Sequence, residues 1–115
     1  MSIEGMWCFV SGETGSSTME SGGVVILDTQ RIYGGDSAMA FIGKYDVDGT
    51  TVTGQIESFR YNPHWEGQDV FGDEAGPTRQ TGFKVSHKEK DFLVGHLTRG
   101  EKTLPILLKK LRDLP

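Results

Sequence analysis

The sequence is poor in the features that mark secreted and membrane proteins. Its single cysteine, Cys8, excludes an intrachain disulfide and favours a reducing compartment, so we expect a cytoplasmic protein. No apolar run approaches the roughly 18 residues of a membrane span, and we expect neither a membrane span nor a leader peptide. Cys8 lies between Trp7 and Phe9 in a strand-like run, where we expect an inert thiol.

Basic charge is also scarce. Twelve lysines and arginines face sixteen acidic residues, for a net charge of −4. Direct nucleic-acid binding is not expected, because such proteins usually carry a basic face. Residues 1–60 hold eight acids and three bases, whereas residues 61–115 hold eight acids and nine bases. The basic residues near the end of the chain are most simply solvated strand edges rather than a phosphate-binding patch.

Strand patterns dominate, and no credible long helix is present. Apolar residues that alternate or are β-branched predict eight short strands, within residues 6–10, 19–28, 31–33, 38–47, 50–61, 78–87, 92–99 and 104–111. Sixteen glycines against four prolines suit tight turns between them. The last segment also fits a helical stripe of leucines, but Pro105 and the strand rhythm of the chain favour a strand.

Eight strands at this spacing predict an all-β barrel or sandwich, in one domain that spans residues 1–115. Eight antiparallel strands can close into a barrel, which removes exposed strand edges and leaves room for one small ligand.

The clearest hairpin joins residues 38–47 to residues 50–61. Its Asp48-Gly49 dipeptide predicts a tight turn with Gly49 in the left-handed region. Alternation predicts that Met39, Phe41, Gly43 and Tyr45 share one face of the first arm. In the second arm it predicts one face with Val52, Gly54 and Ile56 and the other with Thr51, Thr53, Gln55 and Glu57.

A second turn is predicted at Gly34-Gly35-Asp36. Paired glycines supply backbone angles that other residues avoid, and the Asp36 carboxylate can accept hydrogen bonds from free backbone N–H groups. We expect a fixed corner between two strands, with a structural rather than a catalytic role.

The longest segment without strand pattern is residues 62–77. It gathers titratable side chains beside two aromatic ones, namely His64, Trp65, Glu66, Asp69, Phe71, Asp73 and Glu74. Their spacing matches neither a zinc nor a calcium motif, so we expect no metal. We predict instead a loop that covers one barrel mouth with its aromatic side chains tucked down.

No arrangement of catalytic residues can be argued from the sequence. His87 and His96 occupy strand-like positions with no carboxylate predictably beside them, and we interpret both as structural. Neither a Ser-His-Asp, a Cys-His nor a paired-carboxylate pattern is present, so we expect a protein that is not an enzyme and needs no cofactor.

Three features together resemble the GrlR family, small bacterial proteins named for a negative regulator of type III secretion genes. They are Gly5-Met6-Trp7 at the start, GGVVIL at residues 22–27 leading to RIYGGD at residues 31–36 with Gly43 seven residues on, and Arg60-Tyr61-Asn62 after the central hairpin. The resemblance covers roughly residues 4–62, about half of the chain.

The resemblance implies an eight-stranded antiparallel barrel of calycin or lipocalin type that can form a homodimer. It also implies transcription regulation by protein contact, in which the barrel restrains a helix-turn-helix activator without touching DNA. The partner-binding motif of the family's founding regulator is an acidic run in the central hairpin, where this chain has Asp46 and Asp48.

Two function classes are therefore open. The first is a regulatory protein that binds a transcription activator. The alternative is a lipocalin-like binder of a small apolar ligand, with the barrel interior lined by valine, isoleucine, phenylalanine and methionine.

Overall fold

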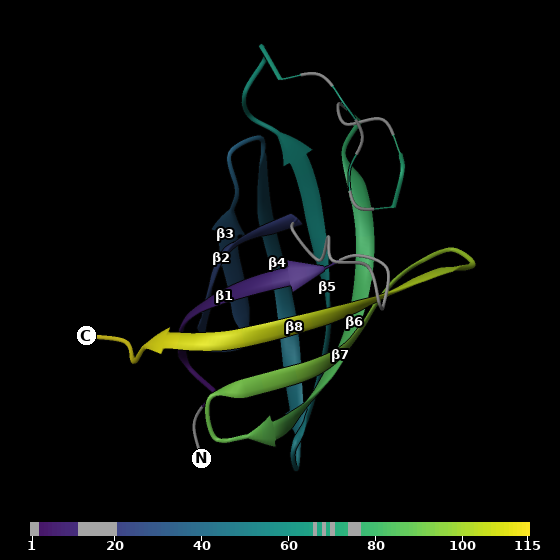
Figure 1. Ribbon diagram of the computed structural model, residues 1–115. Helices are drawn as coiled ribbons and strands as arrows, with labels where there is room; N and C mark the ends of the chain where they lie inside the picture. Colours follow the sequence, from purple (N-terminus) through teal and green to yellow (C-terminus); the bar gives the residue numbers. More distant parts are fainter. Residues whose placement is uncertain (1–2, 12–20, 66, 68, 70, 74–76) are drawn as a thin grey trace.

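Eight antiparallel strands close into one barrel in the computed structural model (Figure 1). The structure describes residues 3–11, 21–65, 67, 69, 71–73 and 77–115. The strands are β1 (Gly5–Ser11), β2 (Ser21–Asp28), β3 (Arg31–Gly35), β4 (Met39–Asp48), β5 (Thr51–Arg60), β6 (Arg79–Glu89), β7 (Phe92–Arg99) and β8 (Lys102–Arg112). The predicted all-β fold class is confirmed, and the barrel is consistent with a calycin or lipocalin type.

Each strand pairs with its neighbours in chain order, and β8 returns to pair with β1. The last segment is thus a strand, as Pro105 and the chain rhythm predict. Pro105 lies one residue beyond the β1–β8 register, which runs to the pair Ser11 and Ile106. No helix long and apolar enough to cross a membrane occurs in the part of the chain that the structure describes.

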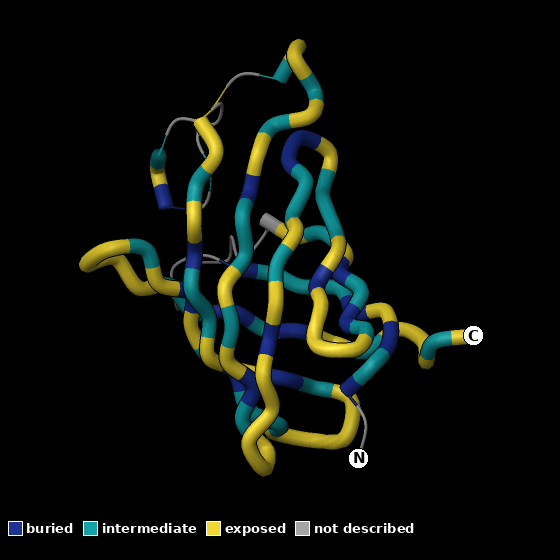
Figure 2. Tube along the Cα trace, turned by 180° about the vertical axis from the view of Figure 1, so that it is seen from behind, coloured by how far each residue is buried: buried dark blue, intermediate teal, exposed yellow. Residues whose placement is uncertain are grey.

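The central hairpin has the predicted form. The pairing of β4 with β5 runs from Met39 and Arg60 to Asp48 and Thr51, and Gly49 has a φ of 63°. Buried and exposed residues alternate along these strands (Figure 2). The predicted alternation is therefore confirmed, with Val52 and Tyr45 buried and Thr53 and Gln55 exposed.

The turn between β2 and β3 carries no sequence signal for its shape. Thr29 and Gln30 have φ values of 51° and 64°, which side chains rarely adopt. Two contacts from outside this hairpin hold the turn. The Thr29 N–H donates to Glu4 Oε2 at 2.8 Å, and the Tyr45 N–H donates to the Gln30 carbonyl at 3.0 Å.

One end of the barrel is filled by side chains. Trp7 is fully buried, and its indole N–H donates to the Ile3 carbonyl at 2.8 Å. Lys110 lies over the indole, with Nζ 5.9 Å from the ring centre. A side chain at Gly5 would lie 2.5 Å from the Arg112 carbonyl oxygen, so this glycine lets the first and last strands approach.

Candidate ligand-binding site

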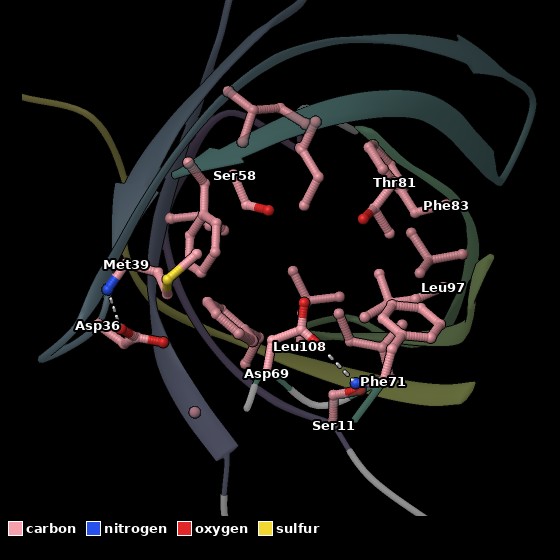
Figure 3. Close-up of a pocket in the computed structure, with 18 of the residues that line it drawn as sticks. Ser11, Asp36, Met39, Ser58, Asp69, Phe71, Thr81, Phe83, Leu97 and Leu108 are labelled. Carbon is pink, nitrogen blue, oxygen red and sulfur yellow. Dashed lines mark hydrogen bonds between the residues drawn. The ribbon is translucent and has the colours of Figure 1, made fainter. Parts of the chain in front are cut away.

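The other end of the barrel encloses a cavity of about 300 Å³ (Figure 3). All eight strands contribute to its wall, because every second residue of a barrel strand points inward. The aliphatic part of the wall comprises Val25, Leu27, Ile32, Val52, Ile56, Val85, Leu93, Leu97, Ile106 and Leu108. The lumen is thus mainly apolar.

Aromatic side chains complete the wall. Phe9 and Phe41 meet edge to face across β1 and β4, with ring centres 5.6 Å apart. Phe83 lies over Gly54 of the neighbouring strand, where a Cβ would come within 2.8 Å of its ring. Because glycine has no side chain, position 54 leaves room for the Phe83 ring in the lumen.

Three buried hydroxyl side chains also line the cavity. Ser11, Ser58 and Thr81 are between 1% and 5% exposed. The Ser11 hydroxyl donates to the Pro105 carbonyl at 2.9 Å, and the Ser58 hydroxyl donates to the Arg79 carbonyl over a long 3.4 Å. These groups lie in β1, β5 and β6 at the end where the long loop leaves the barrel (Figure 3).

A short turn of the long loop closes over this mouth. Asp69 Oδ1 accepts hydrogen bonds from the backbone N–H groups of Phe71 and Asp73, at 2.9 and 3.2 Å. The Gly72 N–H donates to the Asp69 carbonyl at 2.9 Å. This turn directs the Phe71 side chain into the core, where it is 9% exposed.

Arg99, the last residue of β7, fastens this turn to the barrel. Its Nη1 donates to Asp69 Oδ2 at 2.6 Å and to Asp73 Oδ2 at 2.9 Å. Its Nε and Nη2 both donate to Thr81 Oγ1, at 3.3 and 2.9 Å. The guanidinium carbon lies 4.4 Å from the centre of the Phe71 ring.

The charges at the mouth balance. Lys102 Nζ donates to Asp73 Oδ1 at 3.1 Å and to the Phe71 carbonyl at 3.3 Å. Arg99, and after it Lys102, holds the pKa of Asp73 below its ordinary value. We name the two carboxylates of Asp69 and Asp73 with the cations of Arg99 and Lys102 the mouth cluster.

On the opposite side of the mouth, Trp65 packs against Ala38 and Met39. Arg60 Nη1 donates to the Trp65 carbonyl at 3.0 Å. Both aromatic residues of the loop are therefore tucked against the barrel, as predicted, whereas Glu66 and Glu74 lie outside the described residues. Within the described residues no group of three or more His, Cys, Asp or Glu side chains could hold a metal ion.

The corner between β3 and β4 forms another part of the rim. Asp36 Oδ1 accepts hydrogen bonds from the N–H groups of Ala38 and Met39, at 2.8 and 2.7 Å. The Tyr61 hydroxyl donates to the Asp36 carbonyl at 2.6 Å. The predicted acceptor role of Asp36 is confirmed.

The reason for the two glycines differs from the prediction. Neither Gly34 nor Gly35 has a positive φ. A Cβ at Gly34 would instead lie 2.2 Å from the Val24 carbonyl oxygen, and one at Gly35 would lie 2.9 Å from the Met39 carbonyl oxygen. Close approach of the neighbouring backbone, not backbone angle, requires glycine here.

The remaining candidate residues are spread over the barrel. Asp46 and Asp48 are exposed at the far end of β4, away from the corner that opens this strand (Figure 1). His96 is exposed, and the His87 Nε2 is buried without a partner among the described residues. The sequence analysis did not identify Arg99 and Thr81 as site residues. The one signal in the sequence that could have found them is the alternation along their strands, which places both on the inner face.

Neither a protein-family model nor a curated protein matches this chain.

Replacement of Asp36 by alanine should destabilise the barrel by about 1–3 kcal/mol, because two partly buried N–H groups lose their acceptor. Thermal and urea unfolding measure this change. Asp36→Asn, which keeps Oδ1 as an acceptor, is the matched control and should lose much less. Equal stability of wild type and Asp36→Ala would contradict a structural role for the corner.

Proposed function

We propose that the protein is a non-catalytic binder of a small, mainly apolar molecule held in the barrel interior. The cavity of about 300 Å³ carries this proposal. An apolar cavity of about 150 Å³ can hold benzene, so this lumen has room for about two rings or a medium-length carbon chain. Phe9, Phe41 and Phe83 offer the aromatic contacts that such ligands use.

The polar groups of the site are few and grouped at one end. Ser58, Thr81 and the mouth cluster lie near the loop, whereas the deeper wall is aliphatic. This distribution supports a ligand with an apolar body directed toward the filled end and a polar group near the mouth. A few placed polar groups in an otherwise apolar pocket are typical of sites that orient small ligands.

A second candidate function is regulation of a transcription activator, as the GrlR resemblance implies. Asp46, Val47 and Asp48 are all exposed at the end of the central hairpin, and none of them lines the cavity. Two carboxylates flanking an exposed apolar side chain would suit a basic helix-turn-helix surface. In this role the protein would act in the bacterial cytoplasm on type III secretion genes, by protein contact and without binding DNA.

The same resemblance implies a homodimer, for which the outer face of β1–β5 offers a surface. Large apolar residues that are 36–46% exposed occur on each of these five neighbouring strands, namely Met6, Val24, Tyr33, Ile42 and Phe59. Tyr33 and Ile42 are directly paired, and Ile26 connects Tyr33 to Met6 across β2. β8 offers less apolar surface for this contact, because it directs Ile106 and Leu108 into the core. We therefore place the dimer contact on β1–β5.

Ligand binding is tested with the uncharged fluorophore N-phenyl-1-naphthylamine. Wild-type protein should bind it with increased emission, and Ile56→Trp should weaken binding at least about tenfold because the indole fills the lumen. Gln55→Trp is the matched control, since it adds the same side chain to the outer face of the same strand. Equal binding by the two variants, or no binding by wild type, would count against this function.

Activator binding is tested with Asp46→Asn/Asp48→Asn. If the hairpin contacts the helix-turn-helix activator encoded nearest to this gene, the double variant should bind about three- to tenfold more weakly at low salt, with a flatter salt dependence. Asp91→Asn, an exposed acid at the β6–β7 turn, is the control. Unchanged affinity of the double variant would remove the hairpin as the contact.

Homodimer formation is measured by sedimentation equilibrium at micromolar concentration. Wild type should sediment at twice the 12.7 kDa mass of the chain. Tyr33→Glu should dissociate the dimer, because a buried unpaired charge is costly, whereas Val94→Glu on β7 should leave it intact. A wild-type species at the single-chain mass would rule out the dimer.

A further inference from the structure

Arg99 has little capacity left for a ligand. A guanidinium carries five N–H donors, and Arg99 makes four hydrogen bonds to Asp69, Asp73 and Thr81. Its side chain is 16% exposed, and one face is covered by the Phe71 ring. Among the described residues that line the cavity Arg99 is the one arginine, and its N–H groups are thus engaged by Asp69, Asp73 and Thr81.

A ligand with a negative charge would meet unfavourable surroundings at this mouth. Asp69 itself lines the cavity, and its side chain is 12% exposed. A ligand carboxylate next to Arg99 would either lie beside Asp69 and Asp73 or displace one of them. Like charges this close repel strongly in a partly dry site, and displacement would also release the turn that holds Phe71.

Thr81 offers the ligand a hydrogen bond that Arg99 does not. Thr81 is 3% exposed and lines the cavity, with its hydroxyl oxygen directed into the lumen (Figure 3). Both of its side-chain hydrogen bonds come from Arg99, so within the described residues this hydroxyl only accepts. Its own O–H is left to donate, and a buried donor gains most from an acceptor supplied at that point.

Ser58 reinforces the same subsite. The strand register places Thr81 opposite Ile56, so Ser58 is its diagonal neighbour on the inner face. Ser58 is 5% exposed, and among the described residues its hydroxyl makes one hydrogen bond, the 3.4 Å bond to the Arg79 carbonyl. Two hydroxyl side chains on neighbouring strands therefore line the polar end of an apolar lumen.

We propose that the cavity selects uncharged, mainly apolar molecules that carry a hydrogen-bond acceptor such as a carbonyl oxygen, and that the Thr81 hydroxyl donates a hydrogen bond to this acceptor. Arg99 acts through Thr81 and the loop turn: it orients the hydroxyl and holds the mouth cluster, and it does not bind an anion. This inference rests on the ligand-binding function proposed above and names the chemical class of the ligand.

The test compares three probes of equal chain length: 2-octanone, octane and ionised octanoate. Each competes with N-phenyl-1-naphthylamine for the wild-type protein at neutral pH. We expect 2-octanone to bind best and octanoate to bind at least about tenfold more weakly, because its charge is desolvated beside Asp69. Octanoate binding equal to or tighter than 2-octanone would overturn the proposal and make Arg99 an anion site.

Two variants then separate the hydroxyl from the charges. Thr81→Val keeps the shape of the side chain and should weaken 2-octanone about three- to tenfold while octane changes little. Asp69→Asn removes one negative charge and should improve octanoate relative to 2-octanone. Thr81→Ser restores the hydroxyl and should restore 2-octanone binding, and Thr53→Val on the outer face of β5 is the control for the substitution itself.

The outcomes distinguish this inference from the function on which it rests. If neither N-phenyl-1-naphthylamine nor any of the three probes binds the wild type, the ligand-binding function fails and this inference fails with it. If the fluorophore binds but none of the three probes displaces it, the inference alone is wrong. If all bind but Thr81→Val weakens octane as much as 2-octanone, the threonine only supports the loop and the inference alone is wrong. A loss confined to 2-octanone supports it, because a loosened loop would affect every probe.

Discussion

The pairing of β1 with β8 is the constraint on which the rest of this structure depends. This pairing closes the sheet, so that every strand has two hydrogen-bonded neighbours and the barrel has an interior separate from its outer surface. Gly5 lets the two strands approach, and the Lys110 stem covers the Trp7 indole at the seam. Once the sheet is closed, strand alternation alone decides which residues meet in the lumen.

The two ends of the barrel differ in structure, since one is filled by side chains and the other holds the mouth of the lumen. Trp7, Ile3 and Tyr45 fill one end, so the lumen can open only toward the other, where the turn at Asp69 and the corner at Asp36 lie. Asp46 and Asp48 project from the filled end. The two proposed functions therefore use opposite ends of the molecule, and a ligand in the lumen would not obstruct a partner at the hairpin.

Local sequence patterns predicted the parts of this fold that local chemistry determines. Alternation identified the inner faces of β4 and β5, and Asp48-Gly49 identified their turn, because both depend on neighbouring residues alone. The turn at Thr29 and Gln30 was not predictable, since contacts from Glu4 and Tyr45 hold it against residue preference. The need for glycine at positions 34 and 35 was attributed to the wrong cause. Backbone atoms of neighbouring strands leave no room for a Cβ there, and a local sequence pattern does not show which strands are neighbours.

The site was the least predictable part, since it is built from residues distant in sequence. Arg99 lies 30 residues from Asp69 and 18 from Thr81. The sequence shows the acidic residues of the loop as a cluster without basic partners. In the structure Asp69 and Asp73 form ion pairs with Arg99 of β7 and Lys102 of β8. Within the long loop, the tucked aromatic residues were foreseen, because an apolar side chain in a long loop needs a surface to cover.

Closure between the first and last strands also sets the order in which this chain can be completed. Ser11 donates to the carbonyl of Pro105, 94 residues later, and every contact across the seam spans a comparable stretch of chain. Contacts this distant slow folding, because a long loop must be ordered before they form. During synthesis one edge of β1 therefore stays unpaired until β8 has left the ribosome. In that interval a chaperone would have most effect, by covering the unpaired strand edge.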